Sequence, residues 1–322
     1  MFTCAELEAA AALVYRQMSP TPQYTWPLLA ARSGAEVWVK HENHTPTGAF
    51  KVRGGITFID WLRRVHPDAP GIITATRGNH GQSQARAARA AGLRAVVYVP
   101  HGNSVEKNAA MRAFGAELVE FGVDFDEARE EADRVAAQEG LFVVPPFHRE
   151  LVRGVATYAW EFLAQVPDLD TIYVPIGCGS GICGVITVRD ALRSATKVVG
   201  VVSAAAPTAQ LSVAAGRLVP TDSARTFADG MAVRFPVQEA LDIYSHGAER
   251  IVAVSDAAVA DAIRLYYHAT HNLAEGAGAA PLAALMQERE LMRGRKVGVI
   301  LCGGNIDTDW LLTVLQGGVP KV

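Results

Sequence analysis

Nine short runs rich in β-branched residues recur along the 322-residue chain, and segments with helical spacing separate most of them. The runs show little alternation of apolar and polar residues, which is typical of parallel strands covered on both faces. They are Val37–Val39, Ile72–Thr74, Ala95–Val99, Glu117–Phe121, Phe142–Val144, Ile172–Ile176, Val198–Val202, Ile251–Val254 and Val297–Leu301. The pattern predicts an α/β fold with doubly wound, mostly parallel sheets.

Nine strands are many for one compact sheet, so we expect two sheet domains, with Pro145-Pro146 at a crossing between them. The N-terminal stretch Met1–Arg16 is predicted to be an amphipathic helix rather than a signal peptide. Helical spacing is also found at Gln82–Ala91, Asp124–Gln138, Val155–Gln165 and Asp256–Ala269.

The composition excludes several classes of protein. A net charge of -3 without a basic patch argues against a nucleic-acid partner. The four cysteines form no CxxC pair, which argues against a disulfide framework or structural zinc and fits a reducing cytoplasm. The uncharged stretches Thr171–Val188 and Val198–Gly216 contain proline, glycine and hydroxyl residues, so we expect no transmembrane segment and no membrane partner.

A lysine lies in a glycine-rich junction between a predicted strand and a predicted helix. The segment Thr45–Gly55 contains Lys51, follows the strand-like run Glu36–Lys40 and leads into helical spacing over Val52–Val65. Desolvation in a pocket lowers the pKa of a lysine and frees its amine for Schiff-base chemistry. An ordinary solvated lysine is the alternative that this segment alone leaves open.

Two further loops follow predicted strands, at the sheet edge where ligands bind in α/β folds. In the loop Thr74–Gln82, Thr76, Asn79 and the first amides of the next helix could hold a carboxylate, and a plain turn capped by Asn79 is the alternative. The loop Gly177–Gly184 places closely spaced small residues before a helix, which suits a phosphate group.

The second of these loops also has the GxGxxG spacing of nicotinamide dinucleotide sites, at Gly179, Gly181 and Gly184. That fingerprint expects an acidic residue about 20 residues later, at the end of the next strand. Here the next strand ends in Val201-Val202-Ser203. The missing acid makes a dinucleotide the weaker interpretation of this loop.

A third loop, Leu301–Asn305, ends the last predicted strand. One lysine, one carboxylate loop and one phosphate loop together indicate pyridoxal phosphate (PLP). With these residues the chain resembles the fold-type II PLP enzymes (tryptophan synthase β-like), specifically the threonine/serine dehydratase and serine racemase family. The matching motifs lie in the family's order at Thr47–Gly54, Gly78–His80, Gly177–Gly184, Asp229–Val233, Glu275–Ala279 and Cys302–Asn305.

The resemblance implies two doubly wound, mostly parallel sheet domains with the active site between them. Residues 1–45 and 147–322 would form a large PLP-binding domain, and residues 46–146 a small domain. Lys51 resembles the Schiff-base lysine, Asn79 the partner of the cofactor's ring hydroxyl, and Cys302 the residue facing the pyridine nitrogen. The other cofactor-binding residues implied are Phe50, Gly177, Cys178, Gly179, Ser180 and Gly181. Those implied for the substrate are Thr76, Arg77, Gly78 and His80.

The residue at the pyridine nitrogen bears on the reaction that the resemblance implies. A thiol such as that of Cys302 cannot keep the pyridine nitrogen fully protonated, as an aspartate would. The cofactor ring is then a weaker electron sink, which suits β-elimination. The expected enzyme is a cytoplasmic homodimer of amino-acid catabolism that converts L-threonine or L-serine to a 2-oxo acid and ammonia. The alternatives are another 3-hydroxy amino acid (phenylserine, 3-hydroxyaspartate), serine racemase or β-replacement chemistry, and a non-catalytic or nucleotide-binding protein.

Departures from the family's pattern sharpen these expectations. Serine racemases usually have a serine at the position of Arg77, and an arginine is a poor general base, so we expect weak or no racemisation. Arg77 would instead bind a substrate carboxylate or face solvent in an ion pair. A glutamate used by relatives with a divalent-metal site is missing after Val202, so we expect no metal. Only 15 residues follow Asp307, so we expect no regulatory C-terminal domain.

Overall fold

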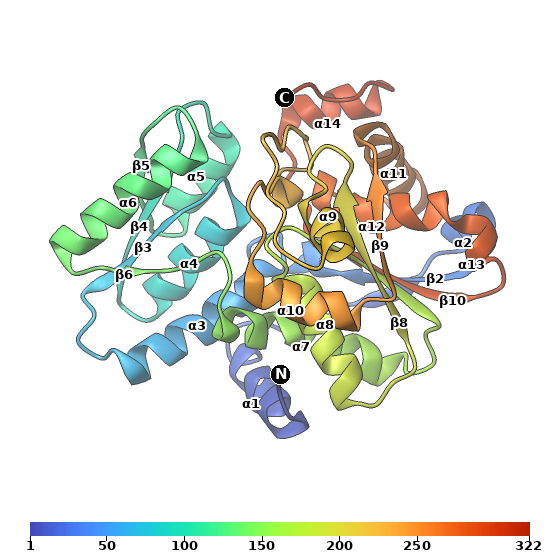
Figure 1. Cartoon of the computed structure of the whole chain (residues 1–322), viewed down its shortest axis with the longest axis horizontal. Helices are drawn as coiled ribbons and strands as arrows, with labels where there is room; N and C mark the ends of the chain where they lie inside the picture. Colours follow the sequence, from blue (N-terminus) through green and yellow to red (C-terminus); the bar gives the residue numbers. More distant parts are fainter.

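Two sheets organise the chain in the computed structural model, which describes residues 1–322 (Figure 1). The larger sheet has the strand order β1-β2-β10-β7-β8-β9 and the smaller sheet the order β5-β4-β3-β6. Every neighbouring pair is parallel except β1 with β2. The predicted α/β fold with two mostly parallel sheets is confirmed.

All nine predicted strands are present, within two residues at each end. The strands are β1 (Gln23–Thr25), β2 (Glu36–His41), β3 (Gly71–Ala75), β4 (Arg94–Val99), β5 (Glu117–Glu120), β6 (Phe142–Val143), β7 (Thr171–Pro175), β8 (Lys197–Ser203), β9 (Arg250–Val254) and β10 (Lys296–Leu301). The sequence prediction missed β1, because this three-residue antiparallel edge strand is mostly exposed and carries no apolar run.

The helices include every segment with predicted helical spacing. They are α1 (Cys4–Val14), α2 (Pro27–Ser33), α3 (Lys51–Val65), α4 (Asn79–Ala90), α5 (Val105–Ala113), α6 (Phe125–Glu139), α7 (Arg149–Gln165), α8 (Ser180–Ala191), α9 (Thr208–Ala215), α10 (Gln238–Gly247), α11 (Asp256–Thr270), α12 (Gly276–Gln287), α13 (Arg289–Met292) and α14 (Thr308–Leu315), with 3-10 helices η1 (Glu42–His44) and η2 (Asp229–Met231). None of the helices combines the length and apolar character that crossing a membrane requires.

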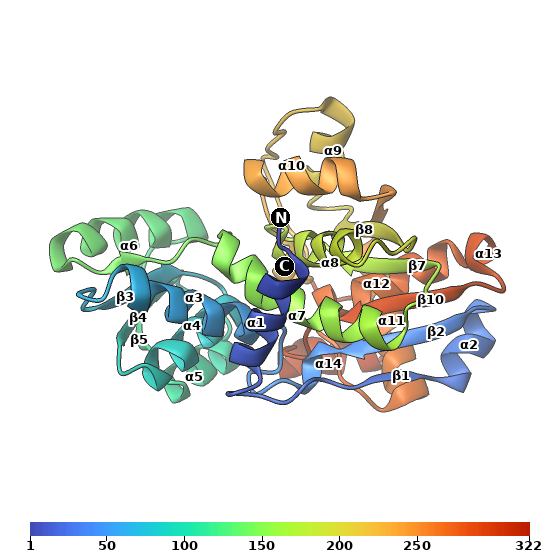
Figure 2. The ribbon, with the colours of Figure 1, turned by 90° about the horizontal axis from the view of Figure 1, so that it is seen from below.

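Helices cover both faces of the small sheet (Figure 2). Successive side chains of a strand point to opposite faces. Ile72 of β3 accordingly packs in the core formed with α3 and α4, whereas Ile73 packs in the core formed with α6. Burial on both faces explains why the central strands β3 and β4 lack polar alternation.

The large sheet is likewise enclosed, with α12 against β7 to β10 on one face and α7 and α8 on the other. Gly298 of β10 lies under Phe162 of α7, and a Cβ at this glycine would lie 2.9 Å from the phenylalanine ring. The chain leaves the large sheet after β2, forms the small sheet with β3 to β6 and returns with β7. The domain limits at residues 45 and 146 remain a prediction.

Candidate active site

A tight turn after β2 brings Lys51 to the end of β10. Gly48 has a φ of +68°, which favours glycine, and its amide donates to the carbonyl of Thr45 at 3.0 Å. Ala49 then forms a bridge with Gly303, and the amide of Phe50 donates to the carbonyl of Cys302 at 2.9 Å. Lys51 therefore begins α3 beside the last strand of the large sheet.

The side chain of Lys51 is half-buried, and its amine points at the loop after β7. Its Nζ donates to Ser180 Oγ at 3.0 Å and lies 4.8 Å from the centre of the Phe50 ring. Burial lowers the pKa of this amine, although the neighbouring Cys178, Cys302 and Glu275 side chains oppose the shift. An amine with a lowered pKa has the character needed of a nucleophile or base.

The predicted phosphate loop presents a set of free backbone donors. Gly179 is the N-cap of α8, with a φ of +99° and no side-chain cap. No backbone amide from residue 177 to residue 182 donates to an acceptor of the chain. Consecutive free amides at a helix N-terminus bind phosphate oxygens well.

Replacing Gly179 by alanine should weaken PLP binding by about tenfold or more, since a left-handed alanine costs about 1–2 kcal/mol. Its Cβ would also lie only 2.7 Å from that of Ala240, so the loop would have to shift. Absorbance titration of the cofactor-free protein measures the affinity. Gly216→Ala is the matched control, because Gly216 has a φ of +64° in open space. Equal affinities of wild type and Gly179→Ala for PLP would contradict the role of this segment as the phosphate loop.

Asn79 is held in one orientation by two partners. Its Nδ2 donates to Glu275 Oε1 at 2.7 Å, and its Oδ1 accepts from Asn305 Nδ2 at the same distance. Asn305 Nδ2 also donates to the carbonyl of Thr47 at 2.8 Å, which fixes the direction of both amides. The N-cap of α4 is Gly78 and has no side-chain cap, so Asn79 is not the cap that the alternative interpretation required. One N–H of Asn79 remains free.

Glu275 is a component that the sequence interpretation placed in a motif but gave no role. It is fully buried, its Oε2 has no hydrogen-bond partner, and burial raises the pKa of its carboxyl to about 7. The ion pair between Lys107 and Asp229 lies nearby, and its two charges act on this carboxyl in opposite directions. Because Glu275 lies 196 residues from Asn79 along the chain, spacing alone gave no signal of their contact.

The raised pKa of Glu275 predicts a pH-dependent cost of folding. The unfolded carboxyl ionises near 4.5 and the folded one near 7, so its contribution to stability is full below pH 4.5 and is lost as the pH rises through 7. Glu275→Gln keeps the acceptor for Asn79 but removes this ionisation. In the cofactor-free protein, the variant should gain about 3 kcal/mol over wild type between pH 4.5 and pH 8.

Urea unfolding at a series of pH values measures this difference. Glu130→Gln, at an exposed carboxylate of α6, is the control and should differ little from wild type at each pH. A difference between Glu275→Gln and wild type that stays constant over this range would contradict an ionisation near pH 7.

The proposed substrate loop is partly assembled around Asn79. Thr76 is buried, and its hydroxyl accepts from the amide of Gly78 at 3.1 Å. His80 is enclosed, its Nε2 has no partner, and burial lowers the pKa of its ring to about 3. Gly78 lies against Lys107, so a Cβ there would lie 2.8 Å from Lys107 Cδ. Arg77 is exposed and makes no ion pair, unlike the solvent-facing pair considered for it.

Cys302 directly follows β10, and its carbonyl accepts from the amide of Phe50, the residue before Lys51. Its side chain is buried, and burial raises the pKa of its thiol well above the ordinary value, so the group is neutral. A neutral thiol can exchange a weak hydrogen bond with a ring nitrogen but supplies no charge to it.

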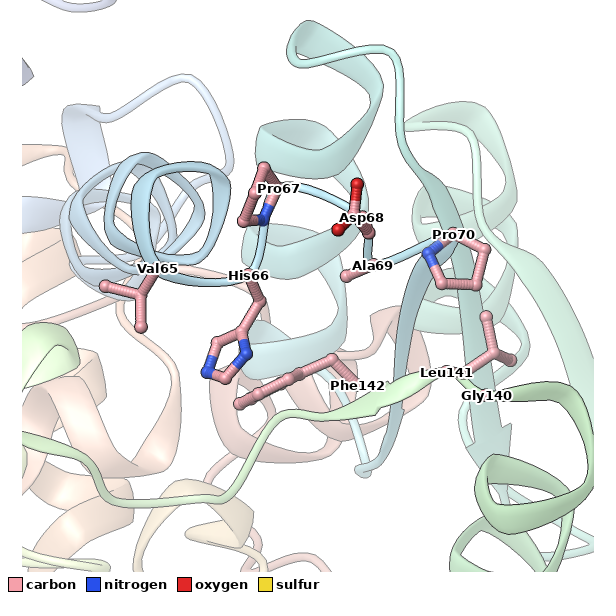
Figure 3. Close-up of a pocket in the computed structure, with 9 residues that line it drawn as sticks. All are labelled: Val65, His66, Pro67, Asp68, Ala69, Pro70, Gly140, Leu141 and Phe142. Carbon is pink, nitrogen blue, oxygen red and sulfur yellow. The ribbon is translucent and has the colours of Figure 1, made fainter.

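A surface pocket lies away from these residues, near the C-terminal end of α3 (Figure 3). It is lined by Val65, His66, Pro67, Asp68, Ala69, Pro70, Gly140, Leu141 and Phe142. Fifteen helical residues span about 21 Å, so this pocket is remote from Lys51. No group of three or more His, Cys, Asp or Glu side chains is arranged to hold a metal ion.

A family model described as "Pyridoxal-phosphate dependent enzyme" matches residues 14–303. The chain belongs to this family. The predicted PLP cofactor and fold-type II assignment are therefore confirmed. The residues present fit the group, because an amine with a lowered pKa, a row of free amides, an oriented Asn79 and a neutral thiol surround one region.

Relatives of this PLP enzyme differ in their reactions. An L-threonine ammonia-lyase of Geobacter sulfurreducens is 37% identical over 89% of this chain and 71% of its own length. An L-threo-3-hydroxyaspartate ammonia-lyase of Pseudomonas is 32% identical over 92% of this chain and 93% of its own. The structure of maize serine racemase superposes with a TM-score of 0.91 at 26% identity, covering 98% of this chain and 97% of the other. These relatives bear out an enzyme of the threonine dehydratase type.

Proposed function

We propose that the enzyme removes water and then ammonia from a 3-hydroxy amino acid, with L-threonine the first candidate, to give a 2-oxo acid. The observation that carries the proposal is the amine of Lys51, which has a lowered pKa and lies 3.0 Å from Ser180 Oγ at the loop of free amides. The threonine ammonia-lyase relative at 37% identity supports this substrate class.

Bound PLP would withdraw electrons from the substrate's α-carbon, so that the α-proton and the β-hydroxyl can depart. Lys51 Nζ would hold the cofactor at rest and take the α-proton afterwards, which its lowered pKa favours. The free amides at the start of α8 would hold the phosphate. The remaining N–H of Asn79 would donate to the ring hydroxyl.

The loop Thr76–His80 would bind the substrate's carboxylate, because it lies at the N-terminus of α4. Neutral Cys302 would leave the pyridine nitrogen without a full positive charge, which favours direct elimination over a long-lived carbanion. Racemisation needs an acid or base on the opposite face, and Arg77 supplies no base there.

A substrate panel tests the proposal. Ammonia and 2-oxo acid are measured with L-threonine, L-serine, L-threo-3-hydroxyaspartate and phenylserine, and D-serine is measured in the L-serine reaction. We expect 2-oxo acid from at least one of the four and little D-serine. Appreciable D-serine without 2-oxo acid would replace the proposal by a racemase. The homodimer, the cytoplasmic location and the domain limits at residues 45 and 146 remain predictions.

A further inference from the structure

Four fully or nearly fully buried charged residues form an ion cluster at the first turn of α3, the helix that begins with Lys51. Its members are Lys40, Glu42, Arg53 and Glu161. Arg53 makes a two-pronged contact with Glu42, Nε to Oε2 at 2.7 Å and Nη2 to Oε1 at 2.9 Å. It makes a second with Glu161, Nη1 to Oε1 at 2.6 Å and Nη2 to Oε2 at 3.0 Å. Lys40 Nζ completes the cluster at 2.6 Å from Glu161 Oε2.

The ion cluster joins α3 to elements of the large sheet. Arg53 follows Lys51 by two residues in the first turn of α3. Its partners lie on η1, which directly follows β2, and on α7, which packs on the large sheet through Phe162. The first turn of α3, the helix that carries Lys51, is therefore held by ion pairs to η1 and α7 beside the large sheet (Figure 2).

A close backbone contact at the same turn supports this interpretation independently. A Cβ at Gly54 would lie 2.8 Å from the carbonyl oxygen of Leu151, and one at Gly154 would overlap the carbonyl oxygen of Arg53. The carbonyl of Lys51 itself accepts from Ser83 Oγ of α4 at 2.6 Å. The start of α3 is thus confined by α7, by α4 and by the ion cluster.

Stability alone is a poor explanation for the ion cluster. Taking four charges out of water carries a desolvation cost that ion pairing often only offsets, and apolar residues of similar volume commonly serve as well. The bidentate contacts of Arg53 provide orientation. A guanidinium bonded to two carboxylates fixes the rotation of its helix about the helix axis and its position along that axis.

We infer that the ion cluster is a positioning element for Lys51, which keeps the amine in register with the phosphate loop. The inference rests on the proposed role of Lys51. Displacement of a reacting group by about 1 Å can cost about 10²-fold in rate, so a small shift of this turn would matter. Motions of the small sheet would then pivot beyond the first turn of α3 and leave the amine in place.

Two charge-neutral double variants separate positioning from stability. Arg53→Met/Glu42→Gln removes one cation and one anion and releases α3. Arg250→Met/Glu288→Gln also removes one cation and one anion, from a bidentate pair at β9 that lies outside the ion cluster and the candidate site. The first should lower kcat by about 10²-fold with KM nearly unchanged, and the second should change kcat by less than about fivefold. Amide hydrogen exchange over residues 45–55 of the cofactor-free protein should accelerate only in the first.

Equal losses of kcat in the two double variants, or wild-type kcat in the first, would overturn the positioning role. If the first variant does not fold, Arg53→Lys keeps the charge without the bidentate contacts, and its kcat should fall by about tenfold at unchanged KM. Wild-type kcat in Arg53→Lys would then refute the inference. An active Lys51→Ala would instead remove the proposed function itself, so the two failures are distinguishable.

Discussion

Lys51→Ala should lower kcat/KM on the best 3-hydroxy amino acid by about 10³-fold or more, because it removes both the covalent anchor of the cofactor and the base for the α-proton. The amine contacts Ser180 and has a lowered pKa, whereas Lys107, the other lysine near Glu275, is held in an ion pair with Asp229. Steady-state assays of 2-oxo acid measure the loss.

Borohydride reduction followed by mass spectrometry supplies a second measurement. It should fix PLP to the peptide containing Lys51 in wild type and to none in the variant. Lys197→Ala is the matched control, since Lys197 is exposed and paired with Glu249 on the surface. Activity of Lys51→Ala within about tenfold of wild type would exclude the assigned role.

Arg53→Met should destabilise the protein by about 3–5 kcal/mol, the usual cost of removing one partner from a buried ion pair. Only Lys40 would remain to compensate the two buried carboxylates of Glu42 and Glu161. The free energy of unfolding in urea measures the effect, with PLP saturating in all samples.

Arg64→Met provides the comparison on the same helix. Arg64 pairs with Asp60 at 3.1 Å, but the side chains are 58% and 36% exposed, so the loss of this pair should cost less than about 1 kcal/mol. Similar costs for the two variants would show that the buried cluster contributes no more than a surface pair.

The amino-acid pattern predicted the central strands of both sheets well, because these strands are buried on both faces. A run such as Val198–Val202 has no solvent-exposed face, so its residues are all apolar or small and the strand is easy to recognise. The three-residue edge strand β1 was missed for the opposite reason, since its residues face solvent or are only half-buried.

The site was predictable where function depends on local geometry. A glycine turn before a lysine and a run of small residues before a helix are visible over a few residues. Contacts between Asn79 and Glu275, or between Arg53 and Glu161, join segments 196 and 108 residues apart. Arg53 in particular looks like an ordinary polar helix residue until its partners on η1 and α7 are known.

The amides of residues 177–182, which find no acceptor within the chain, have a consequence for handling this protein. Inorganic phosphate offers the same oxygens as the cofactor's ester, and any anion that binds the native state alone stabilises it by mass action. Phosphate buffer would thus protect the empty protein against heat while slowing its reconstitution with PLP. Purification in a zwitterionic buffer avoids that competition.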